Sequence, residues 1–224
     1  MSDKNLKPSS VNLALCSLRF FYQEVLEKEI FNKIKSPKLE KKLPTVLTKD
    51  EVRALLAATK NKKHHLLIEM LYSAGLRASE AVSLKVNDLD LTERIGRVIS
   101  GKGKKDRLII LSNNLVEHIE KYLKKREKKG YKSEFLFHVK DPNKHLSVRQ
   151  AQKIIQKTAK KAGINKRVFC HALRSSFATH LLESGVDIRI IQELLGHANL
   201  QTTQRYTQVS TEEIKKVKSP LDNL

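Results

Sequence analysis

The chain has 224 residues, and its 44 Lys and Arg residues against 24 Asp and Glu residues give a formal net charge of +20. This surplus exceeds what solubility requires and predicts a polyanionic partner, nucleic acid ahead of an anionic membrane. No run of 18 apolar residues occurs, the N-terminus lacks the apolar core of a signal peptide, and two cysteines make no disulfide framework. We therefore expect a cytoplasmic protein with no membrane partner.

Aromatic residues make up only 5% of the chain, and Trp is absent. Stacking on single-stranded bases is therefore a weaker expectation than binding to the phosphate backbone of double-stranded DNA. The length suits one good-sized domain, or one domain plus a small extension.

The N-terminal part predicts one helix and a linker. Apolar residues recur at helical spacing over residues 11–26, after Pro8. A single helix with so wide an apolar face must dock on something. Residues 33–47 hold two prolines and five lysines with little periodicity, which is typical of a basic linker. A solvated connector and a DNA contact both fit that charge run.

Two helices follow, over residues 48–59 and 62–74. Thr48 and Glu51 fit a capping box, and Gly75 is a natural residue to end the second helix. His64 and His65 are expected at the surface or half buried, and not as metal ligands, because no zinc-type Cys/His spacing surrounds them.

The period then changes to that of strands, which we expect at residues 86–91, 97–100 and 108–111 as a three-strand meander. The last two are joined by a hairpin in which Gly101 and Gly103 flank Lys102. The glycines would allow close backbone approach around that lysine, although an ordinary turn with surface lysines fits equally well.

Helical spacing resumes over residues 115–129 and 147–162, the latter opened by a second capping box, Ser147 and Gln150. A further helical run begins at residue 171 and another ends at Gly196, and a short basic helix is expected at 211–217. The fold class is thus mainly α with a small three-stranded antiparallel sheet (α+β).

Residues suited to phosphodiester chemistry are spread over these segments. Arg77 and Glu80 are three apart, as are His171 and Arg174, so each pair shares a helix face. The candidates for one shared cleft are Arg77, Lys102, His171, Arg174, His197 and Tyr206. Taken singly, each is an ordinary polar residue on a helix or turn.

Each candidate has a chemical reason to be there. Two guanidiniums can clamp one phosphate and stabilise the charge that builds in its transition state. A phenol attacks only if a base removes its proton, a role open to His171. Lys102 can protonate the leaving oxygen, and His197 can donate a hydrogen bond to the phosphate.

A lone carboxylate, Glu80, is expected to buttress a neighbouring His or Arg. No carboxylate cluster suits a pair of Mg²⁺ ions, so we expect no metal and no cofactor.

Five stretches carry a resemblance to a known family, in the same order and at the same spacing. They span about 130 residues, and together they are specific although each alone is weak. They are Gly75-Leu-Arg-Ala-Ser-Glu80, Gly101-Lys-Gly-Lys-Lys-Asp-Arg107, His171-Ala-Leu-Arg174, Leu194-Leu-Gly-His197 and Thr202-Thr-Gln-Arg-Tyr-Thr207. The chain resembles the tyrosine recombinases of the phage integrase family and is most similar to the Xer subgroup.

The resemblance implies that Tyr206 attacks a DNA phosphate to form a 3′-phosphotyrosyl link, assisted by the other five candidates. It implies a tetramer on DNA, with the C-terminal helix possibly exchanged between protomers. Its domains would be a remnant of a helical DNA clamp (1–32), the linker (33–47), a catalytic domain (48–210) and a C-terminal helix or tail (211–224).

Two departures from the family pattern stand out. Such recombinases usually carry a full helical clamp, whereas only about 40 residues precede Thr48. The residue after Arg174 is commonly His, and here it is Ser175. Alternatives are a non-catalytic DNA-binding protein derived from a recombinase, and a basic RNA-binding protein, which leaves the five stretches unexplained. The target sequence, and the choice between chromosome dimer resolution and mobile-element integration, are open.

Overall fold

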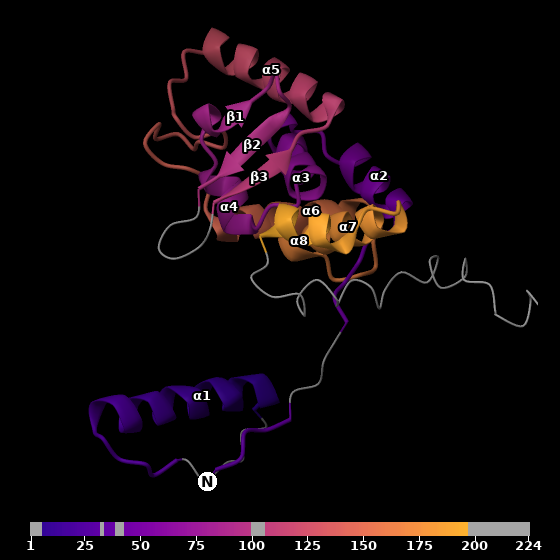
Figure 1. Ribbon diagram of the computed structural model, residues 1–224. Coiled ribbons are helices and arrows are strands. Elements are labelled where there is room, and N and C mark those ends of the chain that lie inside the picture. The colour runs from indigo at the N-terminus through magenta and orange to yellow at the C-terminus, as the bar shows by residue number, and fades with distance from the viewer. Residues whose placement is uncertain (1–5, 32–33, 39–42, 100–105, 197–224) are drawn as a thin grey trace, which may run out of the picture. The chain divides into compact units, whose positions relative to one another are not determined.

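The computed structural model (Figure 1) describes residues 6–31, 34–38, 43–99 and 106–196, and the chain divides into two units, Met1–Lys42 and Leu43–Leu224. In the first unit α1 (Pro8–Phe20) starts at a proline and continues into a π-helical turn, Phe21–Val25. The predicted helix is therefore present, but its α-helical part ends at Phe20.

In the first unit, the side chain of Arg19 binds the segment that follows the π-helical turn. The Nε of Arg19 donates to the carbonyl of Phe31 at 3.2 Å, and the rings of Tyr22 and Phe31 lie 5.0 Å apart. Most of the apolar face of α1 and the π-turn is exposed, including Leu13, Leu18, Phe20, Phe21 and Val25.

The second unit is built around α3 (Lys62–Ser73), which lies among the other helices and the sheet (Figure 1). Its buried residues are Leu66, Leu67, Ile68, Met70 and Leu71. So many apolar residues on one helix need several neighbours to cover them, and α3 packs against α2 (Lys49–Ala57), α4 (Ala78–Ser83), α5 (Asn113–Lys128), α6 (Val148–Lys161) and α7 (Cys170–Glu183).

Both predicted capping boxes are confirmed. The hydroxyl of Thr48 accepts from the N–H of Glu51 at 3.1 Å, and the Glu51 carboxylate accepts from the N–H of Thr48 at 2.8 Å. Ser147 and Gln150 make the same pair of bonds at the start of α6. These bonds satisfy the free N–H groups of the first turn and fix where each helix begins.

The second buried helix, α7, is lined with small residues. Ser175 and Ser176 are fully buried, and the Ser176 hydroxyl accepts from the N–H of Leu47 at 2.8 Å. After α7 the chain turns and forms α8 (Ile188–Leu195), which packs on α7 and ends at Gly196.

The three-strand antiparallel meander is confirmed, in the order β1 (Leu89–Asp90), β2 (Ile95–Val98) and β3 (Arg107–Ile110). The predicted first strand was too long, because Val86–Asp88 forms a 3-10 turn. There the N–H of Val86 donates to the carbonyl of Glu134, outside the sheet.

The other two strands lie one or two residues earlier than predicted, and Val98 pairs with Arg107. Residues alternate between the faces of the sheet, so that Val98, Arg107 and Ile109 face inward. Within the part of the chain described here, no helix is long and apolar enough to cross a membrane.

Gly75 is predicted to be indispensable for packing as well as for backbone conformation. Its φ is +59°, and a Cβ there would lie 2.4 Å from the ring of Phe177. Gly75→Ala should lower the free energy of unfolding by about 3 kcal/mol, from strain plus overpacking, as measured by urea denaturation. Gly130 also has a positive φ (+70°) but open space around it, so Gly130→Ala should cost only about 1 kcal/mol. Equal losses in the two variants would contradict the packing explanation.

Candidate active site

The candidate site is organised by Glu80, in the first turn of α4. Its carboxylate accepts from the backbone N–H of Arg77 at 2.7 Å and from Nη1 of Arg77, also at 2.7 Å. The same side chain thus begins the helix and fixes the guanidinium that precedes it. The predicted role of Glu80 as a buttress for an arginine agrees with this geometry.

A second guanidinium, that of Arg107 at the start of β3, binds Glu80 from the opposite direction. Its Nη1 and Nη2 donate to the two carboxylate oxygens at 2.9 and 2.6 Å, a bidentate pair. The Arg107 side chain is only 4% exposed. Sequence analysis did not single out this residue, although a charged residue at an inward position of a strand signals a buried partner.

A third guanidinium comes from Arg174 on α7, whose side chain is 1% exposed. Its Nη1 donates to the carbonyl of Gly75 at 2.6 Å and lies 3.9 Å from Oε2 of Glu80. The structure therefore brings Arg77 and Arg174, which are far apart in the sequence, to the same carboxylate.

The three arginines also hold the C-terminal end of α8. Arg107 Nε donates to the carbonyl of Leu194 at 2.9 Å, Arg174 Nη2 to that of Leu195 at 2.5 Å, and Arg77 Nη2 to that of Gly196 at 3.2 Å. The last carbonyls of a helix lack partners within the helix and carry its negative dipole end, so cations are favourable there.

Gly196 is required where α8 ends. Its φ is +61°, and a Cβ there would lie 2.8 Å from Cδ of Arg107. The arginine cluster and this glycine together set the direction in which the chain leaves α8.

The electrostatics of the cluster favour anions. Burial alone would raise the pKa of Glu80, but hydrogen bonds from Arg107 and Arg77 outweigh that effect and hold it at about 2. One carboxylate among three guanidiniums leaves a positive excess, which suits a phosphate and disfavours a metal cation at this point.

His171 lies in the first turn of α7, one turn before Arg174. Partial burial of the ring lowers its pKa, and the cations of Arg174 and Arg77 lower it further. The lowered pKa favours the neutral imidazole, which is the form that can accept a proton.

A cleft of about 420 Å³ opens beside Arg77 and Glu80, between α4 and β2. Two further cations, Lys85 and Arg97, line it together with the carboxylate of Asp88. Arg77, with 34% of its side chain exposed, is the member of the arginine cluster most accessible to solvent. Of the predicted site residues, Arg77, Glu80, His171 and Arg174 are therefore grouped, whereas Lys102, His197 and Tyr206 lie outside the described residues.

Comparison with known proteins adds an independent line of information. The sequence pattern of the phage integrase family matches residues 45–213. The tyrosine recombinase XerA of Pyrococcus horikoshii is 45% identical over 209 residues, which is 92% of this chain and 71% of that protein.

Solved structures give the same picture. A crystal structure of XerA recombinase is 33% identical, with a TM-score of 0.72 over 95% of this chain and 76% of that one. XerH site-specific recombinase, solved in a post-cleavage complex with its palindromic difH substrate, is 25% identical, with a TM-score of 0.73 over 96% of this chain and 72% of that one.

The lowered pKa of Glu80 predicts how the free energy of unfolding depends on pH. A carboxyl group whose pKa is lowered by folding stabilises the protein at pH values above its ordinary pKa. For Glu80 this contribution is lost as the pH falls from the ordinary pKa of the carboxyl through about 2, its pKa in the folded protein. At pH 7, Glu80→Gln should lower the free energy of unfolding by about 3 kcal/mol, because it removes one partner of a buried ion pair. The difference from wild type should shrink towards pH 2.5, as measured by urea unfolding.

A matched control is Glu117→Gln. Glu117 pairs with Lys121 one turn along α5, and both side chains are exposed, so its loss should change stability little. A cost for Glu80→Gln no larger than for Glu117→Gln would contradict the central position given to Glu80.

Proposed function

The chain belongs to the phage integrase family, and on that premise we propose that it cleaves and rejoins double-stranded DNA at specific sites through a 3′-phosphotyrosyl intermediate. The observation that carries the proposal is the cluster of Arg77, Arg174 and His171 beside a cation-lined cleft. Its residue types and positive excess fit the needs of a phosphodiester at its transition state.

In the proposed reaction, the Tyr206 hydroxyl attacks the phosphorus of one DNA strand and its proton passes to neutral His171. The bond to the 5′-oxygen breaks, and Lys102 protonates that oxygen as it leaves. Attack by a 5′-hydroxyl of another strand reverses these steps, restores the phosphodiester and frees Tyr206. No external energy source is needed, since the phosphotyrosyl bond conserves that of the phosphodiester.

Two of the three arginines, Arg77 and Arg174, would act on the phosphate in different ways. Arg77 is partly exposed and has N–H donors beyond those bound to Glu80 and Gly196, so it can bind a non-bridging oxygen. Arg174 is buried, and its low-dielectric surroundings strengthen the electric field of its charge. His197 directly follows Gly196, whose carbonyl Arg77 holds, and it would donate to the same phosphate.

The assembly is part of the proposal. Residues 1–32 would be a remnant of the DNA-clamping domain, 33–47 a linker, 48–210 the catalytic domain, and 211–224 a tail exchanged between protomers of a tetramer on DNA. The match to the family over residues 45–213 supports the catalytic assignment. The retained set of reactive residue types supports catalysis over the alternative of a non-catalytic DNA-binding protein.

The chemistry can be tested with a library of nicked duplexes of randomised sequence, incubated with the protein in EDTA. We expect a covalent protein–DNA adduct on a denaturing gel, which disappears in Tyr206→Phe because no hydroxyl remains to attack. Tyr131→Phe, which removes a hydroxyl from an exposed tyrosine, should leave it unchanged. An undiminished adduct in Tyr206→Phe, or none across the library, would refute the proposed mechanism.

Binding should depend steeply on salt. If about six phosphates are neutralised, affinity for duplex DNA should fall on the order of 10³-fold between 50 and 200 mM salt, measured by fluorescence anisotropy. Arg97→Gln, which removes a cation from the cleft, should reduce the salt slope by about one. Affinity that is independent of salt would argue against backbone binding.

A further inference from the structure

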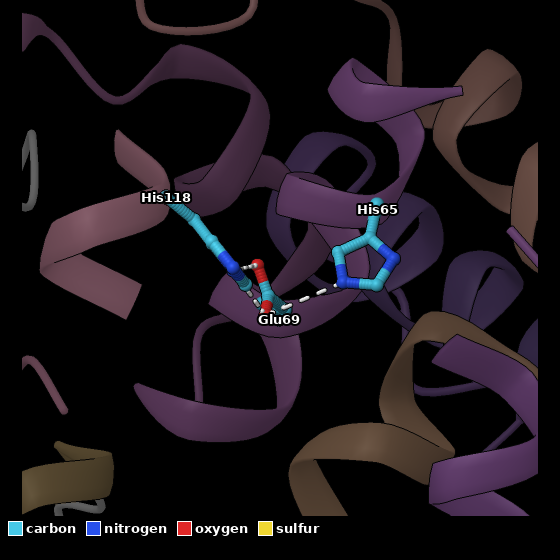
Figure 2. Close-up of side chains that lie close together, drawn as sticks. All are labelled: His65, Glu69 and His118. Carbon is cyan, nitrogen blue, oxygen red and sulfur yellow. Dashed lines mark hydrogen bonds and ion pairs between the residues drawn. The ribbon is translucent and has the colours of Figure 1, made fainter. Parts of the chain in front are cut away.

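Three potential metal ligands lie close together in the second unit, where α3 packs against α5. Figure 2 shows His65 and Glu69 on α3 and His118 on α5, with both imidazoles directed at the carboxylate between them. One ligand atom from each residue can be chosen so that all three lie within 4.8 Å of one another. Among the described residues, this is the cluster of His, Cys, Asp or Glu that could hold an ion.

The fold places these three side chains together for simple reasons. His65 and Glu69 are one helical turn apart and therefore share a face of α3. His118 follows Leu115 by three residues, at the edge of the buried face with which α5 packs on α3. Sequence analysis expected His65 not to be a metal ligand, because short-range spacing cannot reveal His118, which lies 49 positions after Glu69.

The spacing of Glu69 from each histidine suits a small divalent ion, and ligand atoms of the two histidines lie within 4.8 Å of each other. His65 Nε2 lies 3.4 Å from Oε1 of Glu69, and His118 Nδ1 lies 2.8 and 2.9 Å from the two carboxylate oxygens. Ligand atoms 2.0–2.2 Å from a tetrahedral ion lie roughly 3.3–3.6 Å from one another. The first pair already has that spacing, and the second needs to separate by about half an ångström.

One ring nitrogen of His118 faces both oxygens of Glu69, and this nitrogen can donate a proton to the carboxylate or bind an ion beside it. An ion in place of that proton would bind the nitrogen, one oxygen and His65 together. Glu69 is 12% exposed, whereas His65 and His118 are 29% and 41% exposed, so the carboxylate is fixed from beneath and an ion can enter from solvent.

From this geometry we propose that His65, Glu69 and His118 bind a divalent transition-metal ion, Zn²⁺ being the best match. Two imidazole nitrogens and one carboxylate oxygen form a donor set that zinc accepts, with water in the fourth position. The ion joins α3 to α5 and so stabilises the helix that leads, through Gly75, to Arg77. The site is separate from the arginine cluster and takes no part in strand cleavage.

Metal binding can be measured directly on the full chain after treatment with EDTA and desalting. We expect Co²⁺ to bind with one-to-one stoichiometry and to develop visible absorption, Zn²⁺ to displace it, and Mg²⁺, which prefers oxygen ligands, to leave it in place. At a hundredfold excess of Zn²⁺ over its Kd, the melting temperature should rise by roughly 5–10 °C.

Variants assign the ligands. His65→Ala/His118→Ala should weaken Zn²⁺ binding by at least about 100-fold, since even partners of ligands contribute 10–100-fold. His64→Ala changes the neighbouring histidine of the same helix and should bind as wild type does. Glu69→Gln tests the carboxylate with almost no change of shape, should the double variant fail to fold, and it should also bind weakly.

The outcomes are decisive in either direction. No saturable Co²⁺ or Zn²⁺ binding by the wild-type chain, or binding unchanged in both Glu69→Gln and the double-histidine variant, would overturn the proposal. The readout is metal binding and not DNA cleavage, so its failure would leave the proposed recombinase activity untouched.

Discussion

The second unit, Leu43–Leu224, depends on one carboxylate, Glu80, shared by guanidiniums from three parts of the chain. Arg77 from the turn before α4 and Arg107 from β3 bind it directly, and Arg174 from α7 lies 3.9 Å away. None of these cations is stable in a buried setting without an anion or carbonyl acceptors. The ion cluster therefore ties sheet and helices together at the point where chemistry is proposed.

The same arginines secure the end of α8, one carbonyl each from Leu194, Leu195 and Gly196. The chain continues from there to His197 and Tyr206, so the cluster fixes the starting point of the segment that would carry the nucleophile. The structural roles and the proposed catalytic roles thus fall on the same side chains. The positive excess of the arginine cluster, with an imidazole at His171 whose pKa is lowered by burial and by the neighbouring cations, suits the proposed phosphoryl transfer.

Local signals in the sequence predicted much of this structure. The capping boxes at Thr48 and Ser147 and the helix end at Gly75 depend on neighbouring residues only, and all three are confirmed. The first strand was overestimated because the backbone of Val86 bonds to the distant Glu134. Such a bond depends on tertiary structure, which short-range alternation cannot reveal.

The candidate site was predicted in part. Arg77, Glu80, His171 and Arg174 were recognised from spacing and resemblance, and the structure groups them. Arg107 was missed because its importance lies in a bond to Glu80, 27 residues away, and the group formed by His65 and His118 was missed for the same reason. The sequence patterns predicted which residues share a helix face. Contacts between different elements could be seen only in the folded structure.

The most direct test of the central position of Glu80 is a double-mutant cycle on the rate of covalent adduct formation with DNA. It compares Glu80→Gln, Arg107→Gln and the double variant, at a temperature where circular dichroism shows all three folded. Because both residues act through one ion pair, the double variant should react about as slowly as the slower single variant. Rate losses that multiply would show that the two residues act independently, and would contradict the view that one shared carboxylate organises the site.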